Sequence, residues 1–250
     1  RLKIKKIDGI LFDLGASSFH FKKAKRGFSF QEDSLLDMRY SKIRKETALD
    51  IVRGYSKEEI AEILKVYGEE RWAKKIAEAI VSVRSKKEIR TARELAEIVA
   101  QAVPRKFWGK THPATKTFQA LRIYVNKELD NVQIGVKKAI SLLSPQARIL
   151  VISFHSLEDR LVKRIFRLTS EPKKDIIFGR VLKSGSLKII GRFFPSSLEL
   201  EKNPASRSAV LRVAEKRGGK ADVFCFYCNI FCSCRNIDHL VYIRNFFKLS

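Results

Sequence analysis

The first apolar run of the chain covers residues 10–12 and lies between Gly9 and Gly15. This run is too short for a helix, so the pattern predicts a buried parallel strand. Asp13 then falls at the carboxyl end of the strand, which in open α/β sheets is the edge where ligands bind. A carboxylate in such a place costs free energy unless a donor or a cation meets it. Asp13 therefore either contacts a ligand or caps the turn that follows.

Residues 46–104 show apolar positions at helical spacing, without a strand between the helices. Ser56 with Glu59, and Thr91 with Glu94, have the spacing of capping boxes, which satisfy backbone N–H groups at helix starts. These features predict a small helical domain set into an α/β fold. The predicted helices cover residues 57–68, about 69–83 and 92–103.

The α/β pattern returns in the second half of the chain. A strongly apolar strand at 147–154 leads directly into a helix, and His155 lies between them. Ser156 and Asp159 have capping-box spacing at the start of that helix. His155 is either a structural hydrogen-bonding residue or an acid/base group, and its spacing leaves both open. Residues 208–215 predict a last strand, placed as the antiparallel edge of the sheet.

The 250 residues include 51 lysines and arginines against 27 aspartates and glutamates, a formal charge of +24. Such an excess indicates a polyanionic partner, most simply nucleic acid. The surplus is spread through the chain, which favours a long contact surface over a basic tail. Because no apolar run reaches the ~18 residues of a membrane span and the basic start leads directly into a strand, we expect no membrane segment, no signal peptide and a cytoplasmic protein.

A loop after the first strand interleaves aromatic and basic side chains. Phe28 and Phe30 flank Ser29, and a basic cluster lies just before them. This composition suits stacking on bases and pairing with phosphates. It equally suits a solvated loop whose two rings pack into the core, and the sequence leaves the choice open.

A family resemblance rests on several segments in a fixed order. They are DGILFDLGASS, RGFSF, LDMR, YGEERWAKKIA, HPATKTFQALRIYVNKEL, VISFHSLEDRLVKR and NPASRSAVLRVAEK. From about residue 7 to residue 216 the chain closely resembles the bacterial small-subunit ribosomal RNA (cytosine-N4)-methyltransferase family. The resemblance implies transfer of a methyl group from S-adenosylmethionine to the exocyclic amine of a decoding-centre cytidine. The implied partner is small-subunit ribosomal RNA or the small ribosomal subunit.

The resemblance also implies an architecture, an α/β fold with a partial Rossmann-like class I methyltransferase sheet and an inserted all-helical domain. Residues 1–37 are then the first part of the sheet domain, 38–112 the inserted RNA-facing domain and 113–217 the remainder of the sheet domain. Residues 218–250 lie outside the resemblance, and we expect this tail to be disordered or irregular.

Site residues follow from the matched motifs. By family pattern Asp13 contacts S-adenosylmethionine, with orientation of the substrate amine as its second assignment, and no other residue receives a catalytic role. His20 lies where relatives carry a glutamine that also touches the cofactor. Basic side chains in loops and at helix starts are expected to bind RNA, against a solvated-face alternative for each. These are Arg26, Lys116, Arg122, Arg160 and Lys163.

The sequence departs from the family in its cofactor loop. The 250 residues contain no GGH loop and no second strand ending in a ribose-binding acid. Backbone N–H groups of that loop approach the cofactor closely, so its absence removes about half of the expected pocket. We therefore expect an N-terminally truncated chain with one open sheet flank that is inactive or nearly so. Micromolar binding of S-adenosylmethionine in calorimetry would contradict this expectation.

Two other classes of function compete with the enzyme. One is a non-catalytic RNA-binding remnant, and the other is a decayed chain without a stable fold. The tail adds Cys225, Cys228, Cys232 and Cys234, the only cysteines of the chain. Four thiolates can hold zinc, but closed zinc sites usually draw their pairs from separate loops, so we expect no metal and interpret the tail as misread sequence.

Overall fold

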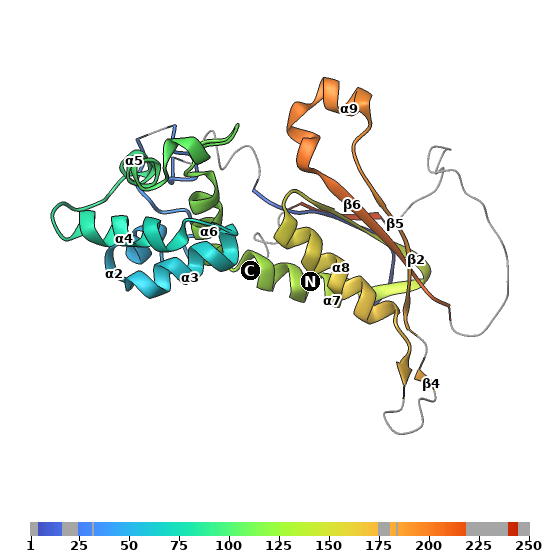
Figure 1. The fold of residues 1–250 in the computed structure, drawn as a ribbon. Helices are drawn as coiled ribbons and strands as arrows, with labels where there is room; N and C mark the ends of the chain where they lie inside the picture. The colour runs from blue at the N-terminus through green and yellow to red at the C-terminus, as the bar shows by residue number, and fades with distance from the viewer. Residues whose placement is uncertain are drawn as a thin grey trace. The chain divides into compact units, whose positions relative to one another are not determined.

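A computed structural model describes residues 5–16, 25–31, 33–174, 181–183, 185–218 and 240–244. The chain divides into two compact units (Figure 1). The sheet unit draws on residues 1–15 and 129–248, and the helical unit on residues 16–128. Among the described residues, no helix is both long enough and apolar enough to cross a membrane.

The sheet unit contains a five-stranded mixed sheet in the order β5-β6-β2-β1-β7. β1 is parallel to both β2 and β7, whereas β6 is antiparallel to both β2 and β5. These strands are β1 (Ile7–Asp13), β2 (Leu143–Ser153), β5 (Leu187–Phe193), β6 (Val210–Lys216) and β7 (Leu240–Arg244). A separate antiparallel pair is formed by β3 (Lys173–Lys174) and β4 (Val181–Lys183).

The core of the sheet unit explains why the first apolar run forms a strand. Ile10 and Phe12 are 3% and 1% exposed, and they join one cluster with apolar residues of β2 and of the two longest helices of this unit. Burial of each such side chain stabilises the fold by about 1.5–3 kcal/mol. The helical elements here are α7 (Glu128–Leu142), α8 (Ser156–Ser170), α9 (Ser197–Lys202) and the 3-10 helix η2 (Pro204–Ser208). α8 packs on β2, β5 and β6.

The helical unit has its own core and short, capped helices. The capping boxes at Ser56/Glu59 and Thr91/Glu94 are both present, which confirms these two helix starts. A third box, Thr47 with Asp50, opens a short helix that the sequence analysis does not predict. The elements are α2 (Ala48–Gly54), α3 (Lys57–Gly68), α4 (Ala73–Arg84), α5 (Ala92–Ala102), the 3-10 helix η1 (Arg105–Phe107) and α6 (Thr115–Asn126).

A close helix crossing places α6 in the helical unit. A Cβ added at Gly68, the last residue of α3, would lie 2.8 Å from the Lys116 carbonyl oxygen and 3.2 Å from the Ala120 Cβ. Only glycine therefore lets α3 and α6 approach this closely. This contact accounts for the extension of the helical unit beyond the expected end at residue 112, since the unit runs from 16 to 128.

Three sequence expectations need correction. The second helix of the unit begins at Ala73, because Glu69 takes the left-handed conformation (φ 48°) that ends α3. β6 is an inner strand, because β5 pairs with its other side. The flank of β1 that was expected to be open is paired with β7, so part of the tail forms a strand.

The two rings of the loop after β1 pack inside the helical unit. Phe28 is 5% exposed and stacks on Tyr40, with ring centroids 5.4 Å apart. Phe30 packs edge-on against Phe118 at 5.2 Å and lies over His112 at 4.6 Å. Core packing is therefore the correct alternative for this pair.

The box at the start of α5 predicts a dependence of stability on pH. Glu94 accepts hydrogen bonds from the Lys87 ammonium and from the backbone N–H groups of Arg90 and Thr91, which lowers the pKa of its carboxyl from 4.5 to about 2. These bonds stabilise the folded state above pH 4.5, and their contribution is lost as the pH falls towards 2. Glu94→Gln should make the free energy of unfolding of the helical unit less dependent on pH across this range.

Urea unfolding followed by tryptophan fluorescence checks this prediction, since both tryptophans of the chain, Trp72 and Trp108, belong to the helical unit. Glu97→Gln, an exposed glutamate on the same helix, is the control. An unchanged pH dependence in Glu94→Gln would contradict the assignment.

Candidate functional site

Asp13 lies at the carboxyl edge of the sheet, beside the loop that follows β2. The parallel register pairs Asp13 with Ile152, and the Leu14 N–H donates to the Ile152 carbonyl at 3.0 Å. Gly15 has φ +91°, and a Cβ built there would lie 3.5 Å from a ring carbon of Phe154. The half-buried Asp13 and the loop leading to His155 are therefore neighbours, as the sequence predicts.

His155 has a structural role at the start of α8. It is the N-cap, and its Nδ1 accepts a long hydrogen bond of 3.4 Å from the Glu158 N–H. In return, the Glu158 carboxylate accepts from the Phe154 N–H at 2.9 Å. The helix is thus capped by His155, with Glu158 bound to the preceding N–H, and not by the expected Ser156/Asp159 box. The imidazole acts here as a capping acceptor through Nδ1.

Asp159 is instead bound by arginines of the sheet. The Arg212 guanidinium on β6 donates from Nε and Nη2 to the two Asp159 oxygens at 2.7 and 2.9 Å. Both side chains are nearly buried, at 13% and 14% exposure, and Arg192 Nη2 lies 3.7 Å from the same carboxylate. This forked pair fixes the first turn of α8 to the sheet.

These features together make a ligand edge. A carboxylate, a loop with a left-handed glycine and the positive end of the α8 dipole meet there. Such a combination can accept hydrogen bonds from hydroxyl or amino groups and donate backbone N–H groups to a carboxylate or phosphate. Asp13 and the 14–16 backbone are the residues that fit a cofactor with those groups. His20 and all four cysteines lie outside the described residues.

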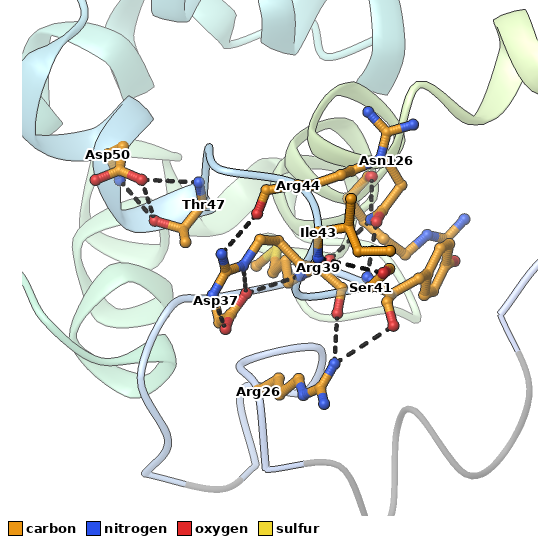
Figure 2. A network of polar contacts seen from close by, with 12 residues as sticks. Arg26, Asp37, Arg39, Ser41, Ile43, Arg44, Thr47, Asp50 and Asn126 are labelled. Carbon is orange, nitrogen blue, oxygen red and sulfur yellow. Dashed lines mark hydrogen bonds and ion pairs between the residues drawn. The ribbon is translucent and has the colours of Figure 1, made fainter. Parts of the chain in front are cut away.

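Two of the expected RNA contacts are engaged inside the helical unit. Arg26 Nη1 donates to the Arg39 carbonyl at 3.1 Å and to the Tyr40 carbonyl at 3.4 Å, as Figure 2 shows. Arg122 donates from Nε and Nη2 to the Glu128 carboxylate at 2.9 and 3.1 Å. The Arg122 and Glu128 side chains are 13% and 5% exposed, so this ion pair belongs to the interior. Both arginines therefore hold the fold of this unit.

Asn126 and Asp37 complete this network (Figure 2). Asn126 is fully buried, accepts from the Tyr40 N–H at 2.8 Å and donates to the Met38 and Arg122 carbonyls. Burial disfavours the charged form of Asp37 and so raises the pKa of its carboxyl. Hydrogen bonds from the Arg39 guanidinium and backbone N–H have the larger combined effect, so the pKa is lowered. The LDMR segment is thus held in place by polar contacts.

The other three expected RNA contacts are exposed. Lys116 lies in the helical unit, and its Nζ donates to the Glu69 carbonyl at 3.2 Å. Arg160 and Lys163 lie on α8 in the sheet unit, at the spacing that places them on one helix face. Their assignment to RNA stays a prediction.

Exposed rings of the helical unit were not predicted from the sequence. Phe107 and Trp108 are 45% and 40% exposed and are surrounded in sequence by basic residues. The criterion applied to residues 19–30, aromatic side chains interleaved with lysine and arginine, would have found them.

Comparisons with known proteins identify a family for this chain. The sequence profile described as "MraW methylase family" matches residues 1–217. A protein of Caldicellulosiruptor bescii named "Ribosomal RNA small subunit methyltransferase H" is 49% identical over 220 residues, which cover 86% of this chain and 71% of the relative. Proteins of the same name from Sulfurihydrogenibium sp. and Polynucleobacter asymbioticus are 49% and 47% identical, covering 86% and 85% of this chain and 70% and 68% of theirs.

Proposed function

Because the chain belongs to the MraW methylase family, we propose that it methylates the N4 amine of a decoding-centre cytidine in small-subunit ribosomal RNA, with S-adenosylmethionine as donor. The observation that carries the proposal is the match over residues 1–217, with Asp13 at the carboxyl edge of the sheet. The names of the relatives and the formal charge of +24 support an RNA substrate. The partner would be the small ribosomal subunit or its RNA, in the cytoplasm.

The chemistry explains what the residues have to do. The lone pair of a cytosine amine is delocalised into the ring, so the amine is a poor nucleophile. S-adenosylmethionine supplies an electrophilic methyl group on a sulfonium. The protein has to exclude water from the amine, aim it at that methyl group and accept its hydrogen bonds.

Asp13 suits these tasks. Its carboxylate can accept a hydrogen bond from an amine or a hydroxyl, and it lies on a strand that the core holds rigidly. We assign Asp13 to cofactor contact first and to amine orientation second, with His20 as a further cofactor contact. Arg160 and Lys163 are the proposed RNA contacts of the sheet unit.

A second function is favoured by one feature of the sequence, its surplus of lysine and arginine over acidic residues, a formal charge of +24. In this alternative the chain binds ribosomal RNA without transferring a methyl group. The excess of lysine and arginine over acidic residues is sufficient for such binding. The affinity would fall as the salt concentration rises.

One experiment separates the two. Undermethylated small subunits are incubated with the protein and S-adenosylmethionine, and the RNA is digested and analysed by nucleoside mass spectrometry. N4-methylcytidine above the level without protein is expected for the enzyme. Salt-dependent binding without any methylated cytidine would select the alternative, and methylation at another atom would overturn the N4 assignment.

A further inference from the structure

Two exposed or half-exposed rings of the helical unit are in contact, and a third exposed ring is next to them in the chain. Trp72 and Phe107 have ring centroids 5.1 Å apart, and Trp108 follows Phe107 in the chain. We call Trp72, Phe107 and Trp108 the aromatic cluster. Single exposed aromatic side chains are common on protein surfaces. A contiguous exposed group, in contrast, usually marks a binding surface.

Cations lie directly over these rings. The Arg71 guanidinium carbon is 5.8 Å from the Trp72 centroid and 5.6 Å from the Phe107 centroid. Lys75 Nζ lies 5.1 Å from the centroid of Trp72, and Lys106 Nζ lies 5.2 Å from that of Phe107. Each of these three cations is exposed and therefore able to meet an anion as well as a ring.

A hollow borders the cluster on the Trp108 side. Its volume is about 330 Å³, within the range of small-ligand sites. The indole that forms one wall is held in place, because Trp108 Nε1 donates to the Val103 carbonyl at 2.9 Å. The lining is mostly apolar, and Glu97, Gln101 and Arg105 are its residues with side chains that can hydrogen-bond to a base. The lining includes Glu97, Gln101, Val103, Pro104, Arg105 and Trp108.

We propose that the aromatic cluster binds an unpaired segment of RNA, with bases stacked on Phe107 and Trp108 and phosphates paired with Arg71, Lys75 and Lys106. Single-stranded RNA is the class of ligand that presents flat rings and a regular row of negative charges together. A protein surface rich in tryptophan and arginine can also bind another protein. The cations over the rings favour the polyanion. The inference deepens the proposed function, because it names the kind of RNA structure that the helical unit contacts.

The protein contains its own reporter for this site, since Trp72 and Trp108 are its two tryptophans. Titration of the 250-residue chain with an unstructured 12-nucleotide oligocytidine should quench tryptophan fluorescence. Heparin, which has the charge but no bases, should bind without comparable quenching. Equal quenching by heparin would overturn the proposal.

Substitutions test the stacking separately from the charge. Phe107→Leu and Trp108→Leu should each weaken oligocytidine binding roughly tenfold, measured by anisotropy of labelled RNA. Ile43→Ala, 76% exposed in the same unit, is the apolar control and should leave affinity unchanged. Because Trp108→Leu also removes a hydrogen bond, Phe107→Leu with an unchanged melting curve is the decisive variant. Binding within about twofold of the unmodified protein would overturn the proposal.

The charge contribution has its own measurement. Lys106→Gln should lower the slope of log affinity against log salt by about 0.7, the value for one phosphate contact on a single strand. Lys86→Gln, an exposed lysine just after α4, should leave the slope unchanged. Equal slopes for the two variants would exclude RNA as the occupant. RNA would also be excluded if Lys106→Gln kept its affinity for RNA but no longer bound a ribosomal protein. Methyl transfer is not needed for any of these readouts, so they fail or succeed independently of the proposed reaction.

Discussion

Arg122→Met is expected to lower the free energy of unfolding of the helical unit by about 3 kcal/mol or more. The substitution leaves the Glu128 carboxylate, 5% exposed, without the two guanidinium hydrogen bonds at 2.9 and 3.1 Å. An unpaired carboxylate in the interior costs far more than the lost attraction alone. Urea unfolding followed by tryptophan fluorescence measures the effect, because both tryptophans report on this unit.

A double variant and an exposed pair serve as controls. Arg122→Met with Glu128→Gln should be more stable than Arg122→Met alone, since no unpaired charge remains. Arg148→Met breaks the Arg148–Glu215 pair of the sheet unit, whose side chains are 47% and 24% exposed, and should cost less than about 1 kcal/mol. If Arg122→Met were as mild as Arg148→Met, Arg122 would be available for RNA after all.

Asp13→Ala should reduce methyl transfer at least about 100-fold in a form of the protein that transfers methyl groups. The proposed reason is loss of the carboxylate that holds the cofactor or the amine at the sheet edge. Activity is measured by N4-methylcytidine formation, and cofactor affinity by calorimetry. A weaker affinity identifies cofactor contact, whereas a lower kcat at unchanged affinity identifies orientation of the amine.

Asp8→Ala is the matched control for Asp13. Asp8 is an exposed aspartate on the same strand, at its amino-terminal end, and its removal should change neither quantity by more than about twofold. Transfer by Asp13→Ala at the level of Asp8→Ala would remove Asp13 from the site.

Sequence patterns predicted the helices and strands that depend on a few consecutive residues. The apolar run before Asp13 gave β1, and the serine and threonine boxes gave the starts of α3 and α5, because strand burial and capping depend on a few consecutive residues. The placement of Asp13 beside the loop leading to His155 followed from the edge rule for parallel strands.

What the sequence could not predict depends on partners far along the chain. The wide helical unit needs the contact of Gly68 with α6, and the inner position of β6 needs β5, whose pattern gives no clear alternation. His155 caps α8 in place of Ser156, and Asp159 has the distant Arg212 as its partner. Arg26 and Arg122 look like surface cations in sequence, and only the folded chain reveals their carbonyl and carboxylate partners.

The parallel pairing of β1 with β2 has a consequence during translation. Residues 14–142 separate these neighbouring strands, so the first strand leaves the ribosome long before its partner. At ordinary elongation rates the delay is on the order of ten seconds. During that time the apolar residues of β1 lack the β2 strand that pairs with them in the fold, while the helices in between can already fold from local contacts. The segment that contains β1 should therefore be a target for chaperones that act on nascent chains.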